Sequence, residues 1–417
     1  MPKKINKKPT VVSLFAGVGG MDLGFIKAGF EILWANDFEA DCVQTYKNNI
    51  GEHIVLGDVK EIKSKDIPNN PDVIIGGFPC QGFSINNIKR TMADERNHLY
   101  KEMLRIIKDK KPKFFVAENV KGILSMEKGA VIELIVNDFK KIGYEVDYKL
   151  LTAADYGVPQ MRQRVFIVGN RIKTKNKFPE ITHFPLPNKN EKQQKLNFGK
   201  TNMQFHIPAK EAIGHLAKVP ITYDPIEKKG KAPIYNHIAS TNVMDTFWGR
   251  KYPVNQFDIC DYLKEYRNKS EWSTQKIDKH FGYRHTAGHW FRKDNNSGSI
   301  PNPSDWWELK KLLKFNSKYD KQVTTLIEKE ITFEQSLRIS NWDTPSDTIT
   351  ATGSEIHPNK ERRISVREGA ILQSFPDDFV FVGALNSMYR QVGNAVPPLL
   401  AERVARLIFS DLRNIPR

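Results

Sequence analysis

The chain of 417 residues is long enough for two domains, or for one large domain with an insertion, and its 40% hydrophobic content is ordinary for a packed globular core. Its formal net charge of +16 indicates a polyanionic partner, although a lysine-rich surface also serves solubility. The chain has no CxxC pair, no Cys/His cluster at ligand spacing and no run of about 18 apolar residues. These absences argue against a disulfide framework, a metal site and a membrane-spanning helix.

Short apolar runs alternate with amphipathic stretches over the first 170 residues. We predict strands at 10–15, 30–36, 52–58, 72–77, 113–120 and 144–150, with helices at 97–108 and 131–142. This alternation is typical of an α/β fold with a doubly wound, mainly parallel sheet and helices on both faces. Ligands of such sheets bind at the carboxyl ends of the strands.

The first predicted strand leads into the glycine-rich stretch "FAGVGG" at 15–20. Its glycines allow a tight turn and a close approach to a ligand, a property that an ordinary turn between strand and helix shares. Asp37 ends the second strand, about 20 residues on, where an acidic side chain can bind a ribose hydroxyl. Asp58 ends the third strand, and no Walker-type sequence follows. The three strand ends predict a nucleoside-binding cleft.

The stretch "VIIGGFPCQGFS" at 73–84 places Cys80 directly after the fourth predicted strand. Two glycines break that strand and Pro79 stiffens the backbone, so we expect the thiol to project into the same cleft. The alternative is a small buried side chain without chemistry. A reactive thiol requires a lowered pKa, which a turn and nearby arginines can supply.

A carboxyl group and two guanidiniums are predicted beside this thiol. Glu118 follows the apolar run 114–117, and Arg162 and Arg164 stand at the start of another strand. Because the two arginines are two residues apart, we expect their side chains to point the same way. The sequence thus predicts a thiol, an acid and two guanidiniums at a nucleoside site.

The composition changes from about residue 171. Residues 171–345 contain 30 Lys and Arg against 19 Asp and Glu, lack clean strand–helix periodicity and mix aromatic with basic residues. After residue 345 periodicity returns, and the end of the chain predicts an amphipathic helix that begins near Pro397 or Pro398. The C-terminal part therefore belongs with the first domain, and the middle is an insertion.

Six segments resemble, in order, those of the cytosine-5 DNA methyltransferase family: "FAGVGG", "PCQGFS", "ENV", "QMRQR", "REGAILQSFP" and "GNAVPP". The resemblance spans nearly the whole chain except its middle. It implies an α/β, Rossmann-like, S-adenosylmethionine-dependent methyltransferase domain with an inserted, smaller target-recognition domain. We assign 1–183 to the catalytic and cofactor-binding domain, 184–365 to target recognition, 366–388 to a hinge region and 389–417 to the return into the catalytic domain.

The resemblance also implies roles for individual residues. Cys80 is the expected nucleophile, Glu118 and Arg164 hold the target cytosine, and Arg162 supports them. The residues expected to bind S-adenosylmethionine are Phe15, Ala16, Gly17, Val18, Gly19, Gly20, Asp37, Phe38, Asp58, Val59, Pro79, Asn394 and Ala395. The residues expected to contact DNA are Gln81, Ser84, Asn86, Arg96, Arg284, His285, Arg292, Thr348 and Thr350, with His289 and Lys293 as further phosphate or base contacts.

The implied reaction is methyl transfer to carbon 5 of a cytosine flipped out of a specific duplex sequence. We expect a monomer that binds double-stranded DNA, with a cognate restriction endonuclease acting separately. The N-terminal residues lack the hydrophobic region of a signal peptide, so we expect a cytoplasmic protein of bacterial or phage origin without a membrane partner.

Three other functions remain open from the sequence. An RNA cytosine methyltransferase shares the fold, but its "CFT" tripeptide is absent, since Asp261 and Tyr262 follow Cys260. A second alternative is a non-catalytic DNA-binding regulator. The intact Cys80, Glu118 and Arg164 argue against it, because such a protein does not require them. A dinucleotide oxidoreductase shares the glycine turn but does not explain "PCQ" together with "ENV".

Overall fold

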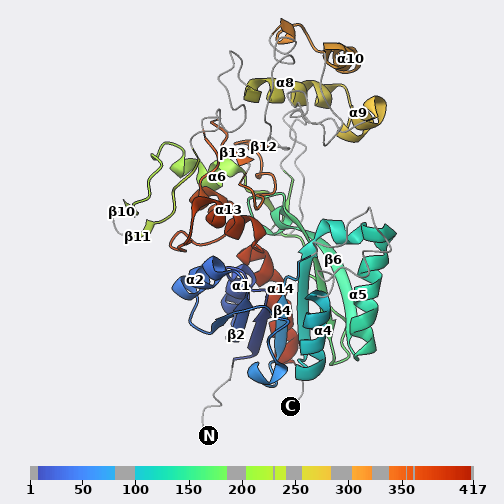
Figure 1. Ribbon diagram of the computed structural model, residues 1–417, viewed down its shortest axis with the longest axis vertical. Helices are drawn as coiled ribbons and strands as arrows, with labels where there is room; N and C mark the ends of the chain where they lie inside the picture. Colours follow the sequence, from blue (N-terminus) through green and yellow to red (C-terminus); the bar gives the residue numbers. More distant parts are fainter. Residues whose placement is uncertain are drawn as a thin grey trace. The chain divides into compact units, whose positions relative to one another are not determined.

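The computed structural model describes residues 8–79, 99–185, 203–228, 231–240, 256–282, 303–321, 338–353, 355–359 and 362–414. The chain forms two compact units (Figure 1). The first consists of Met1–Ile238, Trp342–Thr352 and Val366–Arg417, and the second of Ala239–Asn341 and Gly353–Ser365. The predicted borders at 183, 365 and 388 concern function and stay predictions.

A seven-stranded sheet is the centre of the first unit, in the order β3-β2-β1-β4-β5-β7-β6. Its strands are β1 (Thr10–Leu14), β2 (Glu31–Asp37), β3 (Ile54–Leu56), β4 (Val73–Gly76), β5 (Phe114–Val120), β6 (Glu145–Thr152) and β7 (Gln163–Asn170). The strands from β3 to β5 are parallel, whereas β7 runs antiparallel to both β5 and β6. The predicted mainly parallel sheet and its six predicted strands are confirmed.

Helices cover both faces of this sheet (Figure 1). They are α1 (Gly20–Ala28), α2 (Ala40–Asn49), α4 (Leu99–Lys110), α5 (Ala130–Lys141) and α14 (Pro398–Arg413). Val12 and Ile74 pack with α4 and α5, while Val11 and Val73 pack with α1 and α14. Neighbouring strand residues thus face opposite layers, which explains why these strands are continuous apolar runs.

The C-terminal helix α14 packs closely against α1. It begins at Pro398, where a missing N–H costs no helical hydrogen bond, and so confirms the predicted start. A Cβ atom added to Gly24 of α1 would lie 2.6 Å from Ala401 Cβ. Only a glycine allows this approach, and the end of the chain is thereby built into the first unit.

The other helices and strands complete the two units. In the first unit they are β8 (His183–Phe184), β9 (Gln204–Phe205), α6 (Ala209–Ile213), β10 (Ile226–Lys228), β11 (Lys231–Ile234), α12 (Val366–Leu372) and α13 (Leu385–Asn394), with 3-10 turns at Ser64–Asp66, Lys121–Leu124, Met126–Gly129, Ala153–Tyr156 and Gly214–Leu216. In the second unit they are α8 (Gln256–Lys269), α9 (Thr274–Phe281), α10 (Pro303–Leu313), β12 (Arg338–Ile339) and β13 (Glu355–Ile356).

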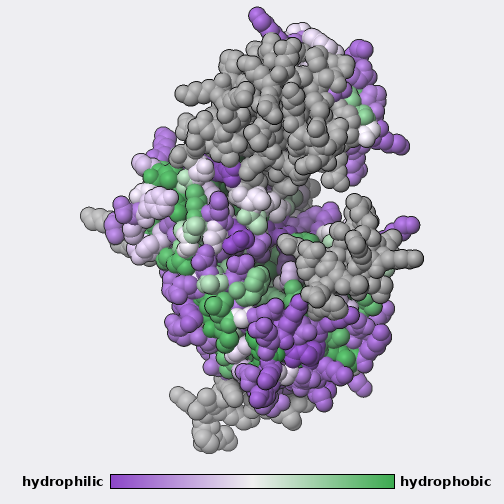
Figure 2. All heavy atoms as spheres, viewed as in Figure 1, coloured by the Kyte–Doolittle hydropathy of each residue, from purple (hydrophilic) through white to green (hydrophobic). Residues whose placement is uncertain are grey.

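The surface is mostly hydrophilic with scattered apolar patches on the face drawn in Figure 2. Phe38, Val55 and Leu56 are exposed apolar side chains on the β2 and β3 side of the sheet. Among the described residues no helix is long and apolar enough to cross a bilayer.

Candidate functional site

A cavity of about 400 Å³ lies at the carboxyl edge of the sheet in the first unit. Its wall is formed by the ends of β1, β2, β4 and β5, the beginning of β7 and the end of α13. The volume is within the range of small-molecule sites, about 300–1,000 Å³. Twelve predicted site residues line it: Phe15, Ala16, Gly17, Val18, Gly20, Asp37, Phe38, Pro79, Glu118, Arg164, Asn394 and Ala395.

The turn after β1 is left-handed at several positions. Phe15, Gly17 and Gly19 have φ angles of 53°, 55° and 84°. A Cβ atom on Gly19 would overlap the Ile50 side chain, so that position requires glycine on steric grounds as well. Gly19 does not line the cavity and instead lets α1 begin directly behind it.

Asp37 at the end of β2 holds this turn. Its Oδ2 accepts the Gly17 amide N–H at 2.8 Å, and its Oδ1 accepts the Glu39 amide N–H at 2.9 Å. Burial raises the pKa of Asp37, and these amide bonds partly offset the rise. The Asp37 side chain therefore lines the cavity and also fixes the backbone that forms part of its wall.

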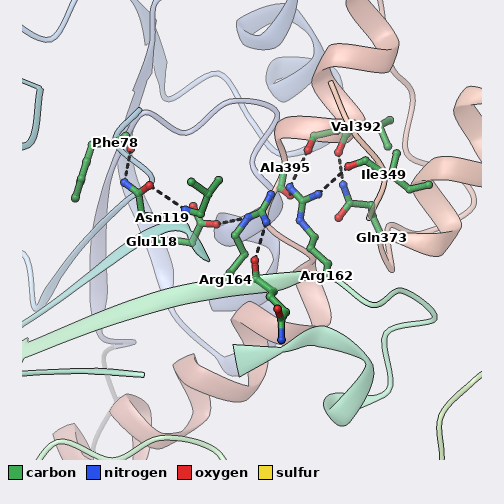
Figure 3. Close-up of polar contacts among 12 residues, drawn as sticks. Phe78, Glu118, Asn119, Arg162, Arg164, Ile349, Gln373, Val392 and Ala395 are labelled. Carbon is green, nitrogen blue, oxygen red and sulfur yellow. Dashed lines mark hydrogen bonds and ion pairs between the residues drawn. The ribbon is translucent and has the colours of Figure 1, made fainter. Parts of the chain in front are cut away.

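Glu118 and Arg164 form a buried ion pair across β5 and β7 (Figure 3). Arg164 Nε lies 2.8 Å from Glu118 Oε1, and the Glu118 side chain is 10% exposed. Because β7 is antiparallel to β5, the beginning of β7 lies beside the end of β5, with Arg164 opposite Val120. Burial raises the pKa of Glu118, while Arg164 and Arg162 oppose that rise. The geometry thus brings together a carboxyl group whose pKa is raised by burial and a guanidinium bonded to it.

The segment after β4 is fixed next to this pair. Asn119 Nδ2 donates to the Phe78 carbonyl at 2.9 Å, and a Cβ atom on Gly77 would lie 3.1 Å from Glu118 Oε2. Pro79 lines the cavity, and Cys80 follows it in the sequence but lies outside the described residues. Asn119 was not predicted as a site residue, although it follows Glu118 in "ENV".

Arg162 does not line the cavity and has no exposed surface. Its guanidinium donates to three carbonyls, those of Ile349 at 2.9 Å, Gly393 at 2.7 Å and Ala395 at 3.0 Å (Figure 3). Arg162 precedes the first residue of β7. The expectation that its side chain points the same way as that of Arg164 assumed that both residues belong to one strand, and this assumption does not apply to Arg162.

A buried polar network lies behind the glycine turn and was not predicted. Asp22 has no exposed surface and accepts hydrogen bonds from the hydroxyls of Ser13 and Tyr46, each at 2.9 Å. Burial raises the pKa of Asp22 to about 6. The only sequence signal was an acidic residue in the first turn of the helix after the glycines.

Charged groups just before α2 and on α13 complete the wall. Glu39 Oε2 lies 3.6 Å from an Arg390 guanidinium nitrogen. Cys42 also lines the cavity, and burial raises the pKa of its thiol, which is therefore neutral. The described lining residues include four carboxyl groups and two guanidiniums. This excess of acidic groups suits a positively charged nucleoside.

Other predicted residues lie elsewhere. Asp58 and Val59 do not line the cavity, and Asp58 Oδ1 accepts the Lys60 N–H at 2.9 Å. Thr348 and Thr350 do not line it either, and Thr348 donates to the Met161 carbonyl at 3.2 Å. The predicted residues outside the described ranges are Cys80, Gln81, Ser84, Asn86, Arg96, Arg284, His285, His289, Arg292 and Lys293.

Comparisons with known proteins agree on one family. The family model described as C-5 cytosine-specific DNA methylase matches residues 9–410. The Type II methyltransferase M.NgoFVII of Neisseria gonorrhoeae is 34% identical over 97% of this chain and 88% of its own length. M1.HphI, a Type II methyltransferase of Haemophilus parahaemolyticus, is 31% identical over 96% and 86%. A protein encoded within an E. coli prophage has a similar fold, with a TM-score of 0.56, 22% identity and coverage of 98% and 100%.

Proposed function

Because the chain belongs to the C-5 cytosine-specific DNA methylase family, it is a DNA (cytosine-5)-methyltransferase with S-adenosylmethionine as methyl donor, and we propose that it acts through a covalent bond between Cys80 and the target base. The observation that carries the proposal is the Glu118–Arg164 pair, 2.8 Å apart in a cavity that Pro79 also lines.

The residues of the cavity fit the cofactor. S-adenosylmethionine supplies an electrophilic methyl group on a sulfonium, and its positive charges suit a wall with more carboxyl groups than guanidiniums. The turn at Phe15–Gly20, the exposed ring of Phe38 and the Asn394–Ala395 turn would hold it. Asp37 contributes by fixing that turn through its Gly17 bond.

Cytosine carbon 5 is too weak a nucleophile to accept a methyl group unaided. The Cys80 thiolate adds to carbon 6 and places electron density on carbon 5. Glu118 donates a proton to ring nitrogen 3, and Arg164 hydrogen-bonds the carbonyl oxygen. After methylation a base removes the hydrogen from carbon 5, the thiolate leaves, and ring nitrogen 3 returns its proton to Glu118. The raised pKa of Glu118 supports its role as the acid.

The cavity is too small for a duplex, which supports the proposal that the cytosine leaves the base stack. Ser84, Asn86 and Arg96 belong to the segment 84–100, which is proposed to close over the flipped base, and Gln81 is proposed to contact the DNA. The basic middle of the chain, with Arg284, His285 and Arg292, is proposed to recognise a short duplex sequence, together with Thr348 and Thr350. We propose that the enzyme acts as a monomer and is the modification partner of a separate restriction endonuclease.

A mechanism-based trap tests the proposal directly. Duplexes from an unmethylated genomic library are made with 5-fluorocytosine and incubated with the enzyme and cofactor. The wild-type enzyme should become attached to DNA through Cys80, whereas Cys80→Ser should bind cofactor but form no adduct. Bisulfite sequencing of methylated DNA then gives the recognised site. Attachment through another residue, or methylation by Cys80→Ser at the wild-type rate, contradicts the assignment.

A further inference from the structure

Arg162 joins three segments that are far apart in the sequence. Its guanidinium reaches from the residue before β7 to the Ile349 carbonyl and to the carbonyls of Gly393 and Ala395. The side chain has no exposed surface, and a planar fork with several donors suits such a set of acceptors. The two segments that contain the acceptors therefore share one buried donor.

One of these segments is the threonine element, defined here as Ser346–Thr350. Its backbone runs along residues 159–161: the Met161 N–H donates to the Ser346 carbonyl at 2.8 Å, and the Ser346 N–H donates to the Pro159 carbonyl at 3.0 Å. The buried Gln160 side chain accepts the Ile349 N–H at 3.0 Å. The element is thus held as part of the same unit as the sheet.

The other two acceptors flank Asn394, which lines the cavity together with Ala395. The threonine element packs directly against this turn, because a Cβ atom on Gly393 would overlap the Thr350 backbone. Arg162 also acts on the reacting groups, since its charge opposes the rise in the pKa of Glu118. The threonine element and the Asn394 turn of the cavity are thus linked both by direct packing and through the Arg162 side chain.

We propose that Arg162 is a positioning residue that couples DNA binding at the threonine element to cofactor binding at the Asn394 turn. The proposal rests on the proposed function, which places DNA at Thr348 and Thr350 and the cofactor at Asn394. Coupling of this kind is reciprocal: DNA tightens cofactor binding by the same factor by which cofactor tightens DNA binding. Arg162 therefore contributes to this coupling without touching either ligand.

The test measures the dissociation constant of S-adenosylhomocysteine by calorimetry with and without the duplex that bisulfite sequencing identifies. In the wild-type enzyme the duplex should tighten binding at least about fivefold, the lower end of typical coupling. Arg162→Lys keeps the charge but cannot span three carbonyls, so the ratio should fall to nearly one. Unchanged coupling in this variant overturns the proposal.

Arg367 is a matched control. It too has no exposed surface and donates to three carbonyls, those of Tyr235 at 2.7 Å, Pro376 at 2.8 Å and Phe379, none of which lines the cavity. Arg367→Lys should lower the melting temperature as Arg162→Lys does but leave the coupling ratio at the wild-type value. Equal loss of coupling in both variants reduces Arg162 to a structural role and overturns the proposal.

A second variant decides the question if Arg162→Lys does not fold. Gln160→Met removes the side-chain bonds to the Ile349 N–H and to the Leu372 carbonyl without touching Arg162, and it should also lower the coupling ratio. A wild-type enzyme that methylates the duplex but shows no coupling overturns this proposal alone. A wild-type enzyme without the Cys80 adduct overturns the function on which it rests.

Discussion

The carboxylate of Asp37 accepts the amide N–H of Gly17 at 2.8 Å, so one side chain at the end of β2 fixes the backbone of the turn after β1. Asp37→Ala should therefore weaken cofactor binding by about 1–3 kcal/mol, because a charge-assisted bond is lost and the turn loosens. Calorimetry with S-adenosylhomocysteine measures the change. Asp138→Ala on α5 is the control, since Asp138 does not line the cavity; an equal loss of affinity in both variants would contradict the assigned role of Asp37.

Glu118→Gln should lower the rate of methyl transfer by about 10²–10⁴-fold, because the amide cannot transfer a proton to cytosine. Burial raises the pKa of Glu118, so in the wild-type enzyme this carboxyl group stays protonated to higher pH than a free one. Its ability to donate a proton is lost as the pH rises through the raised pKa. Single-turnover transfer of a labelled methyl group at several pH values should show this alkaline decrease only in the wild-type enzyme. The same alkaline decrease in Glu118→Gln would assign it to another group.

Asp22 should make stability depend on pH. Its pKa rises from 3.8 to about 6 on folding, so its stabilising contribution is complete below about pH 4 and is lost as pH rises through about 6. A shift of this size corresponds to about 3 kcal/mol. Between pH 4 and pH 7 the free energy of unfolding should therefore decrease by about that much more in the wild type than in Asp22→Asn. Urea titrations of both proteins measure it, and parallel pH profiles would contradict it.

Gly24→Ala should destabilise the protein by about 1–3 kcal/mol, because the added methyl group has no room between α1 and α14. Gly214→Ala is the control: its Cβ atom would lie 3.6 Å from Lys210 Cγ, an ordinary contact, and its φ of −59° suits alanine. Thermal denaturation compares the two variants. A similar loss in both would show that the close helix contact is not the cause.

Affinity for duplex DNA should fall steeply with salt, because an excess of 16 positive charges favours contacts that release counterions from phosphates. Fluorescence anisotropy at several salt concentrations gives the slope of log K against log salt. A flat titration would contradict the role of the basic residues.

The fold could be predicted from the sequence because the apolar runs that form the strands are local signals. The direction of β7, by contrast, is not given by any local pattern in the sequence. Arg164 reaches the carboxyl edge only because β7 is antiparallel, whereas the beginning of a parallel strand would lie at the opposite edge. The motifs therefore predicted that Glu118 and Arg164 share a site. The geometry of the pair, however, depends on the direction of β7 in the sheet.

The roles of Asp37 and Arg162 show what sequence spacing does not contain. Spacing predicted a carboxylate at the end of β2, but the bonds of Asp37 to two backbone amides depend on the conformation of the turn. The acceptors of Arg162 lie roughly 190 and 230 residues away in the sequence, beyond the reach of any local pattern. Conversely, the assignments on residues outside the described ranges, Cys80 foremost, stay predictions.

The cavity wall combines the first strands of the chain with α13, which ends at Asn394. During translation, residues 10–120 leave the ribosome on the order of tens of seconds before that helix does. A nascent chain can therefore fold its first strands, but it lacks one side of the cofactor cavity until synthesis is almost finished. Truncated products of interrupted translation should for this reason be unable to retain a methyl donor.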